Sequence, residues 1–305
     1  MIRGVRRLAW TMCASLIASS SLYLVGSSNA ACPPAGATRE SLLALKAAQW
    51  KIAEVAQTQT LALNLFDCLA DPDPVLRDEI GFAALSAWLR SNQLNPATLH
   101  QLRTQLLQQL RPNPTDKLGF AQPFAALTLA EIARVDRKQA FLSSAERQEM
   151  VNAASSFLIA VRDYRGLDDK AGWRHNVAHG ADFILQLALN PALERPQHEA
   201  MLAALSSQIA PGSHAWRYGE SERLMAPVYY LGIRSGLNAA DWDAWFTHLL
   251  APFKAQAPNT QVSLTLRHNL NGFLLALYFS LQEGNDAEVR KKMLPAVVKA
   301  LKAIG

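Results

Sequence analysis

The sequence lacks the short motifs by which many enzyme families are recognised. It has no glycine loop ending in Lys-Ser or Lys-Thr, no Gly-x-Gly-x-x-Gly fingerprint and no Gly-x-Ser-x-Gly elbow. The run that begins at His198 and Glu199 starts like a zinc-protease helix, but it lacks the second histidine of that motif. The motifs therefore give no support for a nucleotide-binding protein, a dinucleotide-dependent enzyme or a serine hydrolase.

The first 30 residues have the features of a signal peptide. Three arginines and no acidic residue precede an apolar stretch from Leu8 to Val25, and small residues lead to Ala31. We expect cleavage before Ala31, a periplasmic or secreted product, and no stable membrane span after cleavage. An uncleaved anchor is the alternative, although serines dilute the apolar stretch. Lipidation at Cys32 is less expected than ordinary cleavage, because Asn29 occupies the place of the aliphatic residue that a lipoprotein signal carries.

The mature chain is short of net charge. Removing the three leader arginines lowers the formal charge from +5 to +2. So small a charge gives no electrostatic footprint for a nucleic acid, and we expect no nucleic-acid partner. Half of the residues are hydrophobic, which is ample material for a large core.

Cysteine is also scarce. Only Cys32 and Cys68 remain after cleavage, and an oxidising compartment allows these two to form a disulfide. Two unpaired thiols are the alternative. The absence of Cys-x-x-Cys removes support for a thioredoxin-type centre and for a structural zinc knuckle.

Alternating strand patterns are almost absent, whereas apolar residues recur at spacings of three and four. The segment after Asp73-Pro74 predicts a helix, with Leu76 and Ile80 on its apolar side. A capping box of Ser143 and Glu146 predicts another helix that reaches Val161. Further helix starts are predicted at Asn95-Pro96, Pro196, Asn238 and Asn285 or Asp286, and breaks at Arg111–Pro114, Pro191, Pro211-Gly212, Gly236 and Gly284.

These elements predict an all-α protein of about a dozen helices. We expect a signal peptide at residues 1–30, an N-terminal segment at 31–37, and one helical repeat-like domain at 38–305. Short loops favour antiparallel helix pairs, and the length of a pair is close to that of HEAT or armadillo repeats, which predicts a HEAT-like α-solenoid. A closed helical bundle or an α/α toroid is the alternative, because no strong internal sequence repeat is present.

A polar, glycine-punctuated loop feeds a helix over residues 163–182. At 100° per residue, His175, His179 and Asp182 fall on one stripe of this helix, and the apolar residues gather on the opposite side. We therefore expect the helix to pack one face and to offer the other. Arg165 and Asp168 in the loop form either a functional pair or a salt bridge that fixes the loop.

Two histidines four residues apart on a helix can bind a zinc-like divalent metal. Asp182 lies too far along the axis to join them, so a third ligand must come from another helix. Glu222 is the main candidate, with Glu220 and His214 also near in sequence, and Asp182 then orients His179 from outside the metal. The alternative is a polar face without a metal, whose histidines bond the preceding loop while Trp173 fills a helix junction.

The run from Arg165-Gly166 through Gly172-Trp173-x-His175-x-x-Ala178-His179-Gly180-Ala181-Asp182 resembles the signature of an uncharacterised bacterial family, domain of unknown function 2785. Residues 73–80 resemble an earlier motif of that family, and Glu222-Arg223-Leu224 resembles a later one. The resemblance extends over most of the mature chain. It implies an all-helical, HEAT-like fold, and it implies no activity.

Two hypotheses of different classes follow. The first is a binding scaffold of the cell envelope that holds a peptide, a glycan or a small ligand. The second is a metal-dependent hydrolase whose ion is bound by His175, His179 and Glu222. The candidate binding face comprises Arg165, Asp168, Trp173, His175, His179, Asp182, Glu222 and Arg223.

Overall fold

The computed structural model describes residues 32–113 and 116–305, so the predicted signal peptide lies outside the described residues. The described chain confirms the all-α class, with one short hairpin as its only sheet. Its α-helices are α1 Arg39–Ala47, α2 Val55–Asn64, α3 Ala83–Arg90, α4 Pro96–Gln109, α5 Ala121–Lys138, α6 Ser144–Ala160, α7 Asn176–Ala188, α8 Arg195–Ile209, α9 Glu220–Arg234, α10 Ala239–Lys254, α11 Gln261–Glu283 and α12 Ala287–Ile304.

Local capping chemistry sets most helix starts, as the sequence predicts. The Asn95 side chain accepts a hydrogen bond from the Thr98 amide at the start of α4. Ser143 and Glu146 form the predicted capping box of α6. Asn238 and Asp286 cap α10 and α12 in the same way, by accepting bonds from backbone amides of the first turn.

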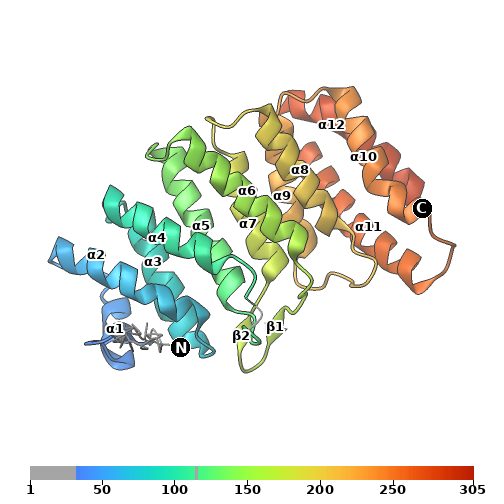
Figure 1. Ribbon diagram of the computed structural model, residues 1–305. Helices are drawn as coiled ribbons and strands as arrows, with labels where there is room; N and C mark the ends of the chain where they lie inside the picture. Colours follow the sequence, from blue (N-terminus) through green and yellow to red (C-terminus); the bar gives the residue numbers. More distant parts are fainter. Residues whose placement is uncertain (1–31, 114–115) are drawn as a thin grey trace, which may run out of the picture. The chain divides into compact units, whose positions relative to one another are not determined.

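The central helices pack against the second helix along the chain rather than only against the next. α5 lies along α7, α7 along α9, and α9 along α11. α6 likewise lies beside α8, and α10 packs on α12 (Figure 1). This arrangement makes α7 a central helix, and ten of its thirteen residues are buried.

The segment before α3 departs from regular α-helix. A 3-10 helix, η1 (Leu65–Ala70), is followed by a π-helix, η2 (Val75–Phe82), where the sequence predicts an ordinary helix. Ile80 of η2 is fully buried, as its place in the predicted apolar side requires, whereas Leu76 is only half-buried. Gly81 brings η2 close to η1, because an added Cβ would lie 3.0 Å from the Cβ of Cys68.

The predicted disulfide between Cys32 and Cys68 is confirmed. It ties the N-terminal segment to η1, where Cys68 is fully buried. The two half-cystines are 36 residues apart in sequence, so the bond closes a loop that contains α1 and α2.

The loop before α7 forms a small antiparallel hairpin. Strand β1 (Leu167–Asp168) pairs with strand β2 (Gly172–Trp173), with Leu167 opposite Trp173. Asp168 closes the turn by accepting bonds from the amides of Lys170 and Ala171. Figure 1 shows the hairpin beside the N-terminal end of α7, the helix that follows it directly in the chain.

No helix within the described residues is long and apolar enough to cross a lipid bilayer.

The disulfide gives a test of the N-terminal fold. We expect Cys32→Ser to lower the free energy of unfolding by about 3–4 kcal/mol, because opening a loop of this length restores chain entropy to the unfolded state. Urea unfolding of the wild type with and without reductant measures the same difference. The variant serves as the control, since reductant must not change its midpoint. A wild type that is equally stable in both conditions contradicts the prediction.

Candidate functional site

A buried arginine attaches the hairpin to the rest of the protein. The side chain of Arg77, on η2, is fully buried, and its Nη2 donates to the carbonyl of Ala171 at 2.7 Å. The same nitrogen lies 2.7 Å from the carboxylate of Asp78, and the guanidinium lies over the ring of Phe120. Burial lowers the pKa of Arg77, and Asp78 opposes that shift. This contact joins the Asp73–Ile80 segment to the loop before α7.

Gly172 is the point where this contact requires the absence of a side chain. Its φ is +75°, a region that glycine adopts without strain, and an added Cβ would lie 2.9 Å from Nη2 of Arg77. Arg174, two residues on, donates to the carbonyl of Leu118 and also lies over the ring of Phe120. The hairpin is therefore held between two guanidinium groups that share one aromatic ring.

His175 stands at the start of α7 in a left-handed conformation, with φ of 57°. Such a backbone is uncommon for a residue with a Cβ, and strain of this kind collects at functional sites. The imidazole stacks on the indole of Trp173, with the ring centroids 4.5 Å apart and the planes 22° from parallel. The hairpin thus supplies the platform on which the histidine rests.

Glu220, the first residue of α9, faces His175 from the neighbouring helix. Its Oε1 lies 3.4 Å from Nε2 of His175, and its other oxygen accepts from the amides of Arg217 and Tyr218. Both side chains are largely buried. Burial alone would raise the pKa of Glu220, but the bonds from His175 and the backbone amides hold it below its ordinary value. The carboxylate is therefore charged at neutral pH.

Tyr218 completes this group at the surface. Its ring meets both Trp173 and His175 edge to face, and 40% of the residue is exposed. Gly166 allows this approach, since an added Cβ would lie 2.2 Å from the Tyr218 ring. We call this group the aromatic junction, defined by Trp173, His175, Tyr218 and Glu220.

His179 lies one turn further along α7 and is buried, with only 7% of the residue exposed. Its Nδ1 lies 3.1 Å from the carbonyl of Pro123, so in the neutral ring Nδ1 carries the proton and Nε2 the lone pair. Burial lowers the pKa of His179 to about 3, helped by the charges of His175 and Arg223. The expectation that α7 offers this histidine to solvent is wrong, because α5 covers that side of the helix.

Asp182 does not orient His179. Instead, both of its carboxylate oxygens accept bonds from Arg223 of α9, which ties α7 to α9. Glu222 is exposed at the start of α9 and makes no ion pair within the described chain. The predicted role of Asp182 as a partner of His179 is therefore wrong. Asp182 and Arg223 instead form an ion pair that joins α7 to α9.

The predicted salt bridge between Arg165 and Asp168 is not formed, because the two side chains have other partners. Arg165 binds Asp163, two residues earlier, through its Nε and Nη2. The carboxylate of Asp168 is used by the amides of the hairpin turn. Each residue stabilises its own part of the loop.

The proposed metal ligands do not converge. Among residues 32–113 and 116–305, no three histidine, cysteine, aspartate or glutamate side chains are arranged to hold a metal ion. The rings of His175 and His179 are 6.0 Å apart between centroids, and one nitrogen of each faces another partner. Of the three carboxylate or imidazole groups considered as additional ligands, Glu220 alone contacts His175.

A second ring cluster adjoins the junction. His214 stacks on Tyr164, and Trp216 meets both rings edge to face. Asn269 of α11 holds this loop by accepting from the Trp216 amide and donating to the His214 carbonyl. Burial lowers the pKa of His214, while the charge of Glu220 opposes the shift. This contact places His214 in the electrostatic field of the junction.

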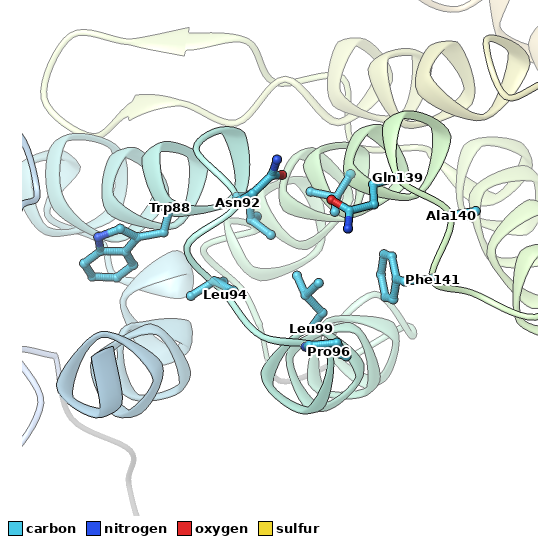
Figure 2. Close-up of a pocket in the computed structure, with 10 residues that line it drawn as sticks. Trp88, Asn92, Leu94, Pro96, Leu99, Gln139, Ala140 and Phe141 are labelled. Atoms are coloured by element: carbon cyan, nitrogen blue, oxygen red, sulfur yellow. The ribbon is translucent and has the colours of Figure 1, made fainter. Parts of the chain in front are cut away.

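A cavity of about 260 Å³ lies elsewhere, between the loop that precedes α4 and the end of α5 (Figure 2). None of its ten lining side chains is ionisable, so the cavity has no group for acid–base chemistry or for metal binding. Its labelled residues in Figure 2 are Trp88, Asn92, Leu94, Pro96, Leu99, Gln139, Ala140 and Phe141.

Three contributors to the site are not predicted from the sequence. Tyr218 belongs to no motif, although its position before Gly219 and a helix start is a usable signal of a surface loop. Arg77 lies in a segment that resembles a family motif, but nothing in the sequence marks it as buried, and Arg174 occupies a position that the signature leaves variable. Glu220 was ranked behind Glu222, and the structure reverses that order.

The comparisons with known proteins give one match. A family described as a protein of unknown function (DUF2785) matches residues 85–279, more than half of the chain. This range contains the hairpin, α7 and the start of α9, and it begins after the Asp73–Ile80 segment. No curated protein and no solved structure matches the chain.

The fit of Gly172 against Arg77 is testable by mutation. We expect Gly172→Ala to lower the free energy of unfolding by about 3 kcal/mol, because the methyl group strains the backbone and displaces a buried hydrogen-bonded charge. The matched control is Gly236→Ala, at φ +71° with no atom within 4 Å of its added Cβ. This substitution should lower the free energy of unfolding by only about 1 kcal/mol, which is the backbone strain alone. Equal losses in urea unfolding would show that Arg77 does not restrict this position.

The buried His179 predicts acid sensitivity. Between pH 6.5 and about 3 the unfolded chain protonates this histidine and the folded chain does not. The free energy of unfolding should therefore be highest above pH 6.5, and below that pH it should fall by up to about 1.4 kcal/mol for each unit by which the pH decreases. Glu220, whose pKa is lowered, adds to the loss only below its ordinary value of 4.5.

Urea unfolding at pH 7.5, 6.0 and 5.0 measures this slope. His179→Asn is the control variant, because the asparagine amide can still donate to the Pro123 carbonyl but does not titrate. The free energy of unfolding of this variant should depend less steeply on pH than that of the wild type, by the amount that corresponds to about one proton in this range. Identical slopes in the two proteins contradict the assignment of the effect to His179.

Proposed function

Because the chain belongs to the DUF2785 family, to which no function is assigned, we propose its function from its geometry: it is an exported helical-repeat binding protein of the cell envelope. Its ligand is a small polar molecule, a sugar or a peptide, held at the aromatic junction. The observation that carries this proposal is the strained, largely buried His175, stacked on Trp173 and faced by the charged Glu220.

The packing of the helices supports a repeat architecture. The contacts of α5 with α7, of α7 with α9 and of α9 with α11 form one row, and α6 and α8 belong to another. Two rows of helices related in this way are typical of α-solenoids of the HEAT kind. A closed bundle or toroid would need extensive contact between the first and last helices, and the main helix contacts of the described chain do not include such a pair.

The junction has the properties of a binding site for a polar ligand. Tyr218 and Trp173 present aromatic rings of the kind that stack on sugars and planar groups. Glu220 faces Nε2 of His175, which favours a proton on that nitrogen and leaves Nδ1 as an acceptor for a ligand donor. Strain at His175 is consistent with a side chain held in place for contact rather than for packing.

A metal-dependent hydrolase has less support. It needs a third ligand beside His175 and His179, and Glu222 is exposed on α9 without contact to either ring. His179 is also committed to the Pro123 carbonyl through Nδ1. The export part of the proposal is supported by the leader sequence, and the Cys32–Cys68 disulfide agrees with an oxidising compartment.

The proposal is tested by NMR of mature protein labelled with ¹⁵N at histidine, titrated with an N-acetylglucosamine trisaccharide and, separately, with trialanine. We expect one of these probes to shift the ring signals of His175, which the His175→Gln variant identifies. Tyr218→Ala should weaken the binding at least about tenfold, because it removes the exposed ring of the junction.

Tyr278→Ala is the matched control, since Tyr278 is a half-buried aromatic residue of α11 whose hydroxyl accepts only from Gln282. Its affinity for the probe should equal that of the wild type. A probe that binds with equal affinity to Tyr218→Ala contradicts the junction as the site. No shift with either probe contradicts the proposed ligand classes.

A further inference from the structure

A second surface, away from the aromatic junction, carries positive charge that the protein does not neutralise. It is formed by neighbouring sides of α5, α7 and α9, which lie in one row. We call it the arginine face and define it by Arg134 and Arg137 of α5, Gln186 of α7, and Tyr230 and Arg234 of α9.

The acidic residues beside this surface already have partners. Both oxygens of Glu131, on α5, accept bonds from Arg90 of α3. Both oxygens of Asp182, on α7, accept bonds from Arg223 of α9. In each of these bidentate pairs both carboxylate oxygens already face a guanidinium outside the arginine face. The remaining arginines of the row are left without an acidic partner.

Arg137 is the centre of the uncompensated charge. Its Nε donates to Oε1 of Gln186 at 2.8 Å, which holds the guanidinium against α7, the helix that packs on both α5 and α9. Burial lowers its pKa, the neighbouring charges of Arg134 and Arg234 lower it further, and Glu131 and Tyr230 oppose part of this shift. Arg134 stands one turn before it on the same helix. Three guanidinium groups from two helices therefore gather here, and those of Arg134 and Arg234 lie near enough to Arg137 for their charges to act on it.

A simpler reading is that these arginines complement the negative ends of their helices. Arg137 and Arg234 do lie in the last turns of α5 and α9. In that case each side chain would donate to the last carbonyls of its own helix. Arg137 donates to Gln186 instead, and within the described chain Arg134 and Arg234 make no hydrogen bond or ion pair with any group. Their donors remain free.

The surroundings fit a ligand that is more than a bare ion. Tyr230 and Ile233 of α9 are 37% and 38% exposed beside Arg234. A phenol and an aliphatic side chain next to free guanidinium groups can contact the carbon skeleton of a molecule whose charged group binds the arginines.

We propose that the arginine face is a binding site for an oxyanion, a carboxylate or phosphate group of a small organic ligand, held by Arg134, Arg137 and Arg234. Guanidinium forks match the geometry of these oxyanions. The site does not include any residue of the aromatic junction, so a failed test of one proposal does not contradict the other.

The test uses citrate and tripolyphosphate as probes, titrated into the full mature chain by calorimetry at constant ionic strength. We expect saturable binding of at least one probe. Arg137→Gln and Arg234→Gln should each weaken the binding about tenfold or more, because each removes charge-assisted hydrogen bonds to the anion. Binding of citrate alone assigns a carboxylate ligand, and binding of tripolyphosphate alone assigns a phosphate ligand.

The matched control is Arg267→Gln on α11, because Arg267 is also exposed and makes no ion pair within the described chain. It should leave the affinity within about twofold of the wild type, since a remote charge acts only through a screened field. Thermal unfolding without a probe checks that each variant is folded. The inference is overturned if neither probe binds, or if all three variants bind equally well.

Discussion

The buried guanidinium of Arg77 fixes the part of the protein on which the site depends. Removing a charge from water is unfavourable unless hydrogen bonds and an opposite charge surround it. Arg77 meets this requirement with Asp78, with the Ala171 carbonyl and with the face of Phe120. Since the Ala171 carbonyl belongs to the hairpin turn, the hairpin cannot move away without removing a hydrogen bond from a buried guanidinium. The position of Trp173 follows from this constraint.

The position of the hairpin in turn fixes the start of α7, the helix that follows it. Trp173 supports the ring of His175, and His175 starts α7 in a conformation that its own side chain disfavours. The interactions around it must compensate for that strain, and the charged Glu220 on α9 is one of them. The same two helices are joined again by the Arg223–Asp182 pair, two turns further along α7. The junction is therefore held from both helices.

The sequence predicts the features that depend on local chemistry. Helix starts at Asn95 and Ser143 follow from side chains that reach amides three residues away, so they are visible in a single sequence. The burial of His179 is different, because helical periodicity predicts which residues share a face of a helix but not which element packs against that face. α5 covers that face, and only tertiary packing reveals it. The preference for Glu222 over Glu220 failed for the same reason, since positions two residues apart on a helix point about 200° apart and only packing shows which of them faces α7.

The distribution of charge explains why composition conceals the arginine face. The formal charge of +2 over residues 31–305 is a sum, and it does not record which acids are already paired. Glu131 and Asp182 each accept from an arginine on the neighbouring helix, so each is already the partner of a guanidinium other than Arg137. Local charge therefore depends on partner choice across helices. A small net charge is compatible with the compact oxyanion site that we propose, because three guanidinium groups are enough to bind one oxyanion.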